Sequence, residues 1–212
     1  MTSVAPVRVV LASASPARLS VLRAAGLDPA VLVSGVDEEA VLSALPGSPH
    51  EARLAALATA KADAVLDRVT GPAVVLGCDS MLLLDGELVG KPWTADVARQ
   101  RWSRLSGRTG DLLTGHAVVR LDASGNVTAR AAATRRTGVT FATVTPSEVD
   151  AYVGTGEPLE VAGAFTLDAL GGWFVDRIDG DPSNVIGISL PLLRSLLTEV
   201  GVAVTDLWVD RA

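Results

Sequence analysis

The sequence contains 1 cysteine, and lysines and aromatic residues are also scarce among its 212 residues. A single cysteine excludes an internal disulfide and argues against a cysteine-based zinc site, which fits a reducing compartment. No run of about 20 apolar residues is long enough to span a membrane. The N-terminus lacks the basic start and apolar core of a signal peptide. We therefore expect a cytoplasmic protein that does not contact a membrane.

Positive charge is in deficit, because the net charge is -6 at pH 7. Together with an aromatic content of 4%, this argues against a nucleic-acid-binding module, which normally shows a basic face. An anionic substrate must then be met by local positive groups. Since 49% of the residues are hydrophobic and no repeat or long linker is present, we expect a single domain over residues 1–212.

Lysine is rare even among the basic residues. Of 18 lysines and arginines only Lys61 and Lys91 are lysines. A chain rich in alanine, valine, leucine and arginine indicates a base composition that disfavours lysine codons, so the two lysines stand where an ammonium is needed. A compact ammonium suits a tight polyphosphate site better than a guanidinium. The alternative is that two surface lysines persisted by chance.

The first apolar segment, residues 7–12, predicts a buried strand that leads directly into a helix over residues 16–25. Ser13 and Ser15 lie at this junction, and Arg18 follows in the first helical turn. Helix N-termini bind phosphate through free N–H groups and the helix dipole. The junction therefore predicts a phosphate site, although serines that only cap the helix would give the same pattern.

Lys61 has an unusual place in its helix. Ser48 and Glu51 form a capping-box pattern that predicts a helix over residues 50–67. The apolar residues of this helix recur so that Lys61 lies on their side and not on the solvated face. A charge there needs a partner or a ligand, unless the side chain reaches solvent at an edge.

Asp79 follows the apolar segment 73–78, which predicts a carboxylate at the carboxyl end of a strand. This is the usual active-site edge of an α/β sheet. Residues 81–84 are expected to continue as a strand, and Asp85-Gly86 predicts a two-residue hairpin turn that returns the chain to Lys91, towards Asp79. A turn or helix-capping role for Asp79 is the alternative.

The remaining pattern indicates an α/β fold with a mixed sheet. Further elements are expected as strands at 31–34, 112–121 and 127–143 and helices at 95–105, 146–153 and 190–200, the second of these opened by the capping box Thr145 to Glu148.

Several motifs, in this order, resemble the Maf family of nucleoside triphosphate pyrophosphatases from about residue 8 to residue 200. They are Leu11 to Arg18, Val36-Asp37-Glu38, Leu57 to Ala62, Cys78-Asp79-Ser80, Gly90-Lys91-Pro92, Leu105 to Thr109, Ala162 to Phe165 and Ser183 to Gly187. The resemblance implies hydrolysis of a nucleoside triphosphate to the monophosphate and pyrophosphate in the cytoplasm, aided by a divalent cation such as Mg²⁺ or Mn²⁺. It also implies an elongated mixed α/β fold with a cleft between two lobes, like the inosine triphosphatase group, and often a homodimer.

The chain departs from the family members that act on dTTP and UTP. It has Ala17 where they carry an arginine and Asp168 where they carry a glutamine. In both places it leans towards a branch that accepts 7-methyl-GTP, although Ser80 follows neither branch. A carboxylate at Asp168 favours a base that donates hydrogen bonds, such as cytosine, guanine or a modified base, over one that accepts them.

The residues also predict a mechanism. Mg²⁺ commonly binds one or two carboxylates plus phosphate oxygens, and Glu38 with Asp79 would supply them. Asp79 would also orient or deprotonate the attacking water. Lys61, Lys91 and Arg18 would neutralise the leaving pyrophosphate. Glu38 has an alternative role as an acidic residue in the first turn of a helix.

Ser13 and Ser15 are expected to bind phosphate and not to act as nucleophiles, because neither His50 nor His116 lies in a motif that suggests a partnered base. Arg108 either contacts phosphate or braces the following strand. Two other functions remain open. A nucleotide sensor would bind without hydrolysis, and a nucleotidyltransferase would usually carry a glycine-rich loop, which residues 13–18 lack.

Overall fold

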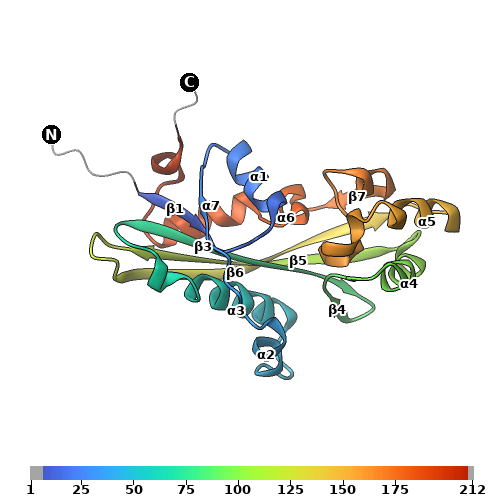
Figure 1. The fold of residues 1–212 in the computed structure, drawn as a ribbon, viewed down its shortest axis with the longest axis horizontal. Helices are drawn as coiled ribbons and strands as arrows, with labels where there is room; N and C mark the ends of the chain where they lie inside the picture. The colour runs from blue at the N-terminus through green and yellow to red at the C-terminus, as the bar shows by residue number, and fades with distance from the viewer. Residues whose placement is uncertain (1–6, 210–212) are drawn as a thin grey trace. The chain divides into compact units, whose positions relative to one another are not determined.

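A computed structural model describes residues 7–209, and they form the expected mixture of helices and strands (Figure 1). The strands are β1 (Arg8–Leu11), β2 (Ala30–Val31), β3 (Ala73–Leu84), β4 (Glu87–Val89), β5 (Thr109–Leu121), β6 (Val127–Phe141) and β7 (Val175–Asp179). The α-helices are α1 (Pro16–Ala24), α2 (Glu38–Ser43), α3 (His50–Asp63), α4 (Ala95–Leu105), α5 (Pro146–Gly154), α6 (Pro182–Ile186) and α7 (Leu190–Glu199). Short 3-10 helices are η1 (Leu66–Arg68), η2 (Glu157–Glu160), η3 (Ala162–Ala164), η4 (Leu170–Phe174) and η5 (Val204–Leu207).

The strands form one sheet in the order β2-β1-β3-β5-β6-β7, with β4 paired to β3. β1 runs parallel to both β2 and β3, whereas β4 is antiparallel to β3 and β7 is antiparallel to β6. The prediction of an α/β fold with a mixed sheet is therefore confirmed. The chain divides into two compact units. Unit 1 comprises residues 1–79, 115–135 and 190–212, and unit 2 comprises residues 80–114 and 136–189. The predicted single domain and the predicted cleft depend on how these units are placed, and both stay predictions.

Unit 1 is built around β1 and β3, whose pairing runs from Arg8↔Ala73 to Leu11↔Leu76. Figure 1 shows α3 along one side of these strands and α7 on the other. Gly77 lets α3 approach β3 closely, because a Cβ atom there would lie 2.0 Å from the carbonyl oxygen of Ala58. The close contact packs the alanines of α3 against β3. It thereby fixes the distance between β3 and the helical turn that carries Lys61.

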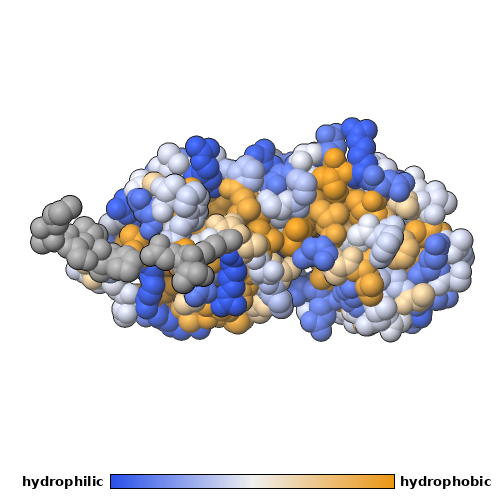
Figure 2. Space-filling model, turned by 90° about the horizontal axis from the view of Figure 1, so that it is seen from above, coloured by the Kyte–Doolittle hydropathy of each residue, from blue (hydrophilic) through white to orange (hydrophobic). Residues whose placement is uncertain are grey.

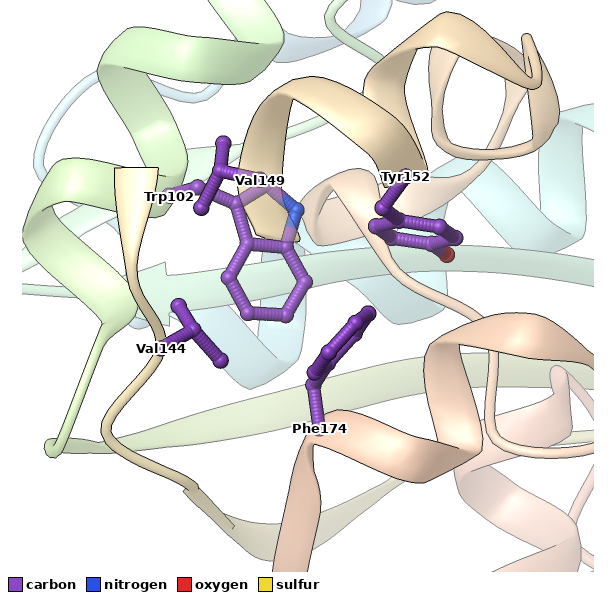
Figure 3. Close-up of a pocket in the computed structure, with 5 residues that line it drawn as sticks. All are labelled: Trp102, Val144, Val149, Tyr152 and Phe174. Atoms are coloured by element: carbon purple, nitrogen blue, oxygen red, sulfur yellow. The ribbon is translucent and has the colours of Figure 1, made fainter. Parts of the chain in front are cut away.

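Unit 2 has its own core around Trp102, which meets the rings of Phe141, Tyr152 and Phe174 edge-on at centroid distances of 5.6–5.7 Å. The indole nitrogen of Trp102 donates to the carbonyl oxygen of Ala164 at 2.8 Å. Figure 3 shows the small gap beside this cluster, lined only by apolar and aromatic side chains. The gap has no room for a water molecule, so it is core packing and not a ligand site.

Helix starts test the sequence patterns most directly. Ser15 caps α1, with its hydroxyl accepting from the Arg18 N–H, and Thr145 with Glu148 forms the predicted capping box of α5. The predicted N-cap at Ser48 is wrong. Pro49 precedes α3 and no side chain caps it. Proline at this position fixes an extended backbone before the first helical residue, which shifts the start of the helix past the serine.

The strand segments expected at 73–78 and 81–84 form one continuous strand, β3, so the predicted break between them is wrong and Asp79 lies within a strand and not after it. The parallel pairing with β1, however, stops at Leu76. Asp79 is therefore still beyond the parallel part of the sheet, on the side where β1 ends.

The surface carries polar residues with apolar ones between them, as Figure 2 shows for one face. The most exposed large apolar side chain is that of Trp173 at 84%. Between residues 7 and 209, every helix is too short or too polar to cross a membrane.

Candidate active site

Four of the predicted site residues gather in unit 1, and all four are buried. Ser13, Arg18, Lys61 and Asp79 have exposed fractions of only 8%, 8%, 9% and 5%. They come from the loop after β1, from α1, from α3 and from β3. Buried charged groups are costly unless they are paired or meet a ligand, so a group of three in one place marks a functional site.

Arg18 links the loop after β1 to β3. Its Nη1 donates to the Ser13 hydroxyl at 3.0 Å and to the carbonyl oxygen of Cys78 at 2.8 Å. The N–H of Ser15 donates to the same Ser13 hydroxyl at 3.2 Å, and the Ser15 hydroxyl caps α1. The loop after β1 is thus tied to the residue that precedes Asp79. Both serines have roles in holding the protein together, and phosphate binding by either stays a prediction.

Lys61 bridges two carboxylates. Its Nζ is 2.7 Å from Oε1 of Glu38 and in closer contact with Oδ1 of Asp79. The side chain of Glu38 is 48% exposed, whereas that of Lys61 is 11% exposed. Glu38 is the first residue of α2, whose N-cap is Asp37, so it lies in an acidic first turn and also contacts Lys61. The expectation that Lys61 needs a partner on the apolar side of its helix is confirmed.

Asp79 has one oxygen that the protein leaves without a partner. Oδ2 is buried and accepts no hydrogen bond from any group within residues 7–209, while Oδ1 contacts Lys61. Burial raises the pKa of this carboxyl above its ordinary value, although Lys61 and Arg18 oppose the shift. A buried carboxylate oxygen that lacks a hydrogen-bond donor can bind a proton, a water molecule or a cation.

A divalent cation fits this pair of carboxylates. Residues 7–209 contain no group of three or more histidine, cysteine, aspartate and glutamate side chains that could hold a metal alone. Glu38 and Asp79 offer two carboxylates, the number that Mg²⁺ commonly takes when phosphate oxygens and water complete its shell. The site therefore suits a cation that binds together with a phosphate ligand.

Cys78 lies next to Asp79 but is not a nucleophile. It is fully buried, and burial raises the pKa of its thiol to about 11. At neutral pH the thiol is protonated and acts as a small apolar side chain.

The other two predicted residues, Lys91 and Asp168, belong to unit 2. Lys91 follows β4, which pairs back along β3 from the predicted turn at Asp85. Its Nζ lies 4.8 Å from the ring centroid of Trp93, an exposed residue with a φ of 62°. A bulky residue at positive φ is strained, and such strain is common at functional sites. The predicted approach of Lys91 to Asp79 stays a prediction.

Asp168 is exposed on a loop. Glu157, which the sequence patterns did not single out, fixes this loop through hydrogen bonds. Glu157 accepts hydrogen bonds from four donors, which lie before and after Asp168 along the chain. They are the Tyr152 hydroxyl at 3.1 Å, the Thr166 hydroxyl at 2.5 Å, the Gly171 N–H at 3.0 Å and the Leu170 N–H at 3.2 Å. These bonds lower the pKa of Glu157 against the desolvation that opposes them. No local pattern marks Glu157, because its partners are up to 14 residues away.

Asn184, in the motif from Ser183 to Gly187, is fully buried in unit 2. Its Nδ2 donates to the carbonyl oxygen of Leu112 at 3.3 Å and to the Thr137 hydroxyl at 3.1 Å. It therefore joins α6 to β5 and β6. A buried asparagine on a five-residue helix could have been suspected only from the apolar residues that follow it.

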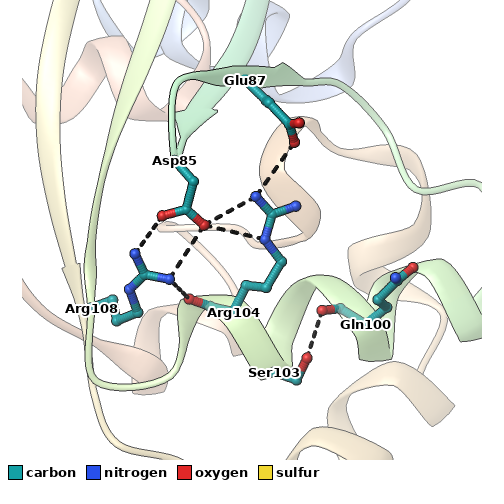
Figure 4. A network of polar contacts seen from close by, with 6 residues as sticks. All are labelled: Asp85, Glu87, Gln100, Ser103, Arg104 and Arg108. Carbon is teal, nitrogen blue, oxygen red and sulfur yellow. Dashed lines mark hydrogen bonds and ion pairs between the residues drawn. The ribbon is translucent and has the colours of Figure 1, made fainter.

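Arg108 braces the turn between β3 and β4, whereas the predicted alternatives were a phosphate contact and bracing of the following strand. Arg104 and Arg108 both form ion pairs with the Asp85 carboxylate at the turn between β3 and β4 (Figure 4). Nη2 of Arg104 also lies 3.5 Å from Oε2 of Glu87. The four side chains are exposed or half-exposed. The network fastens α4 and the start of β5 to the β3–β4 turn.

Comparison with known proteins places the chain in a family. Residues 8–200 match the family described as Maf-like protein. A nucleoside triphosphate pyrophosphatase of Nocardia farcinica is 60% identical over 204 residues, which cover 94% of this chain and 96% of the relative. Proteins with the same name from Saccharopolyspora erythraea and Rhodococcus jostii are 58% and 59% identical, covering 95% of this chain and 97% and 96% of their own lengths. The chain therefore belongs to the Maf family.

Proposed function

We propose that this protein is a nucleoside triphosphate pyrophosphatase, a hydrolase that cleaves a nucleoside triphosphate into the monophosphate and pyrophosphate. The observation that carries the proposal is the buried cluster of Ser13, Arg18, Lys61 and Asp79, in which Asp79 keeps an oxygen without a partner. The proposal is also supported by the shared name of the relatives that match nearly the whole chain.

In the proposed reaction a water oxygen attacks the α-phosphorus, and the bond from that phosphorus to the bridging oxygen breaks. Asp79 accepts the proton of the water through its free oxygen, and pyrophosphate leaves. Lys61 and Arg18 balance the negative charge that grows on the leaving group. Lys91 has the same role in the proposal, and Ser13 and Ser15 donate hydroxyl hydrogen bonds to phosphate oxygens. No covalent intermediate is required.

Glu38 and Asp79 are the residues that would hold a divalent cation, Mg²⁺ or Mn²⁺. Such a cation supplies Lewis acidity at the α-phosphoryl group and offsets the charge of the triphosphate. The protein has a net charge of -6, so its overall field repels the substrate and local compensation is necessary.

The base preference is proposed from Asp168. An exposed carboxylate accepts hydrogen bonds, so it favours the amino-bearing edge of cytosine or guanine, including modified forms such as 7-methylguanine. Strict preference for dTTP would contradict this assignment. We further propose a cytoplasmic location, from the single cysteine, and a homodimer, from the resemblance; the mass of the purified protein in solution tests the latter.

A triphosphate panel tests the function. The purified protein is incubated with Mg²⁺ or Mn²⁺ and CTP, UTP, dTTP, GTP or 7-methyl-GTP, and the products are separated. We expect pyrophosphate and a monophosphate in equal amounts. Nucleotide binding without pyrophosphate release would favour a sensor. Transfer of the nucleotide to an added sugar phosphate would favour a nucleotidyltransferase.

A further inference from the structure

Lys61 occupies the carboxylate oxygens that a cation would use. Its Nζ lies 2.7 Å from Oε1 of Glu38 and contacts Oδ1 of Asp79 directly. The ammonium is therefore the counter-ion of both carboxylates. A divalent cation that binds the same pair must first displace this ammonium or share the two carboxylates with it.

The charge balance of the cluster also opposes the binding of a cation by itself. Glu38 and Asp79 carry two negative charges, and Lys61 and Arg18 carry two positive charges within the same electrostatic network. The cluster is close to neutral before any ligand arrives. A cation brought alone would face two nearby positive groups, and in a poorly solvated site this repulsion is large. A triphosphate, with about four negative charges, reverses the balance because it supplies new partners for Lys61 and Arg18.

The position of Lys61 allows its ammonium to move from the two carboxylates to a phosphate group. Its ammonium lies at the end of a flexible four-carbon chain on the last turn of α3, whereas Asp79 is fixed within β3. Oδ2 of Asp79 remains without a partner even while Lys61 holds Oδ1. The carboxylate therefore has a free oxygen to offer as soon as the competing charge moves.

We propose that Lys61 acts as a built-in counter-ion that keeps divalent cations from binding to Glu38 and Asp79 until a polyphosphate draws its ammonium away. The protein then takes up the cation and the nucleotide together, as one complex. This inference rests on the proposed function for the identity of the nucleotide, but the competition between Lys61 and the cation exists without hydrolysis. Lys61 thereby has a positioning role before catalysis, in addition to balancing phosphate charge.

The test is a Mn²⁺ titration of the protein by equilibrium dialysis, with no nucleotide present. We expect weak binding by the wild-type protein and binding at least about tenfold tighter by Lys61→Met, which keeps the length of the side chain and removes its charge. Lys61→Arg keeps the charge and is expected to bind as weakly as the wild type. Arg23→Gln removes a positive charge from an exposed pair with Asp28 in the same unit, and it controls for net charge alone.

A second measurement needs no variant, so it stands even if Lys61→Met fails to fold. Mn²⁺ binding by the wild-type protein is compared with and without a non-hydrolysable α,β-methylene triphosphate, after subtraction of the Mn²⁺ that the analogue binds by itself. We expect the analogue to tighten Mn²⁺ binding by about tenfold or more. Equal Mn²⁺ affinity in both conditions would overturn the proposal, as would a folded Lys61→Met that binds Mn²⁺ no more tightly than the wild type.

These outcomes are separate from the failure of the proposed function. If the wild-type protein hydrolyses no triphosphate, the proposed pyrophosphatase activity is wrong, and the Mn²⁺ titration still decides the role of Lys61. If it hydrolyses triphosphates but binds Mn²⁺ tightly without nucleotide, the activity stands and the counter-ion role is wrong.

Discussion

The two units use charged residues in opposite ways. In unit 1, Arg18, Lys61 and Asp79 are almost completely buried, and one carboxylate oxygen has no partner. In unit 2, Asp85 and its two arginines lie at the surface, where every carboxylate oxygen of Asp85 is bonded (Figure 4). The buried cluster is incompletely satisfied, and the exposed network is satisfied.

This difference shows which charges serve the fold and which serve a ligand. Exposed ion pairs add little stability, because water and salt screen them. Buried charges cost free energy, and replacing them with apolar groups is often neutral or stabilising. A cluster that remains buried, charged and partly unpaired is therefore explained by a ligand that completes it. The comparison assigns function to unit 1's cluster and bracing to the network around Asp85.

The largest expected effect comes from exchanging one aspartate in each region. Asp79→Asn removes the proposed proton acceptor and the proposed cation ligand while keeping the shape of the side chain, so pyrophosphate release should fall by about 10²–10⁴-fold. Asp85→Asn makes the same chemical change in the exposed network and should leave the rate near that of the wild type. Steady-state kinetics on both variants, with circular dichroism to confirm folding, make the comparison. Similar losses in the two variants would break the distinction between the regions.

A smaller effect is expected from pH. Burial raises the pKa of Asp79, and only the carboxylate form binds a cation. As pH falls below this raised pKa, protons compete and Mn²⁺ affinity should drop by up to about tenfold per unit, starting above the ordinary aspartate range. Above the pKa, affinity should not depend on this group. The measurement is Mn²⁺ binding in the presence of the α,β-methylene analogue between pH 4 and 8, and a midpoint in the ordinary aspartate range would contradict the shift.

Glu157 allows a finer test within unit 2. Glu157→Gln keeps one acceptor and loses the charge that holds the Thr166 hydroxyl and the Leu170 and Gly171 N–H groups. Hydrogen exchange of these amides should accelerate, and the ratio of kcat/KM between CTP and UTP should change several-fold, on the order of 1 kcal/mol. Glu160→Gln, at an exposed neighbour, is the control. An unchanged ratio together with faster exchange would limit Glu157 to a purely structural role.

The smallest effect is expected from the exposed network itself. Arg104→Gln removes contacts to Asp85 and Glu87 that water already screens. The melting temperature should fall by no more than about 2 °C, and the difference should shrink at high salt. Thermal unfolding at low and high ionic strength checks this, and a large, salt-independent loss would show that the network is more than a surface brace.

Most regular elements could be predicted because their signals are local. The capping box at Thr145, the cap at Ser15 and the Asp85 turn depend on neighbours within three residues, and all three are confirmed. The predicted N-cap at Ser48 is wrong because Pro49 occupies the N-cap position of α3. The break expected between residues 78 and 81 is absent, because β3 continues through Asp79 and Ser80 to its pairing with β4.

The residues of the candidate site also divide into those with a local sequence signal and those without one. Lys61 was found because a lone charge on an apolar helix side violates the helical pattern, and Asp79 was found because a carboxylate interrupts an apolar strand. Glu157 and Asn184 were missed because their roles come from partners far along the chain, which no spacing rule connects. The roles of Lys91 and Asp168 stay predictions.

The most direct test of the central claim is hydrolysis in ¹⁸O-labelled water with CTP or GTP and Mg²⁺, followed by mass spectrometry of both products. If water activated by Asp79 attacks the α-phosphorus, the label appears in the monophosphate and pyrophosphate remains unlabelled. Label in pyrophosphate, or formation of a diphosphate and inorganic phosphate, would contradict the account.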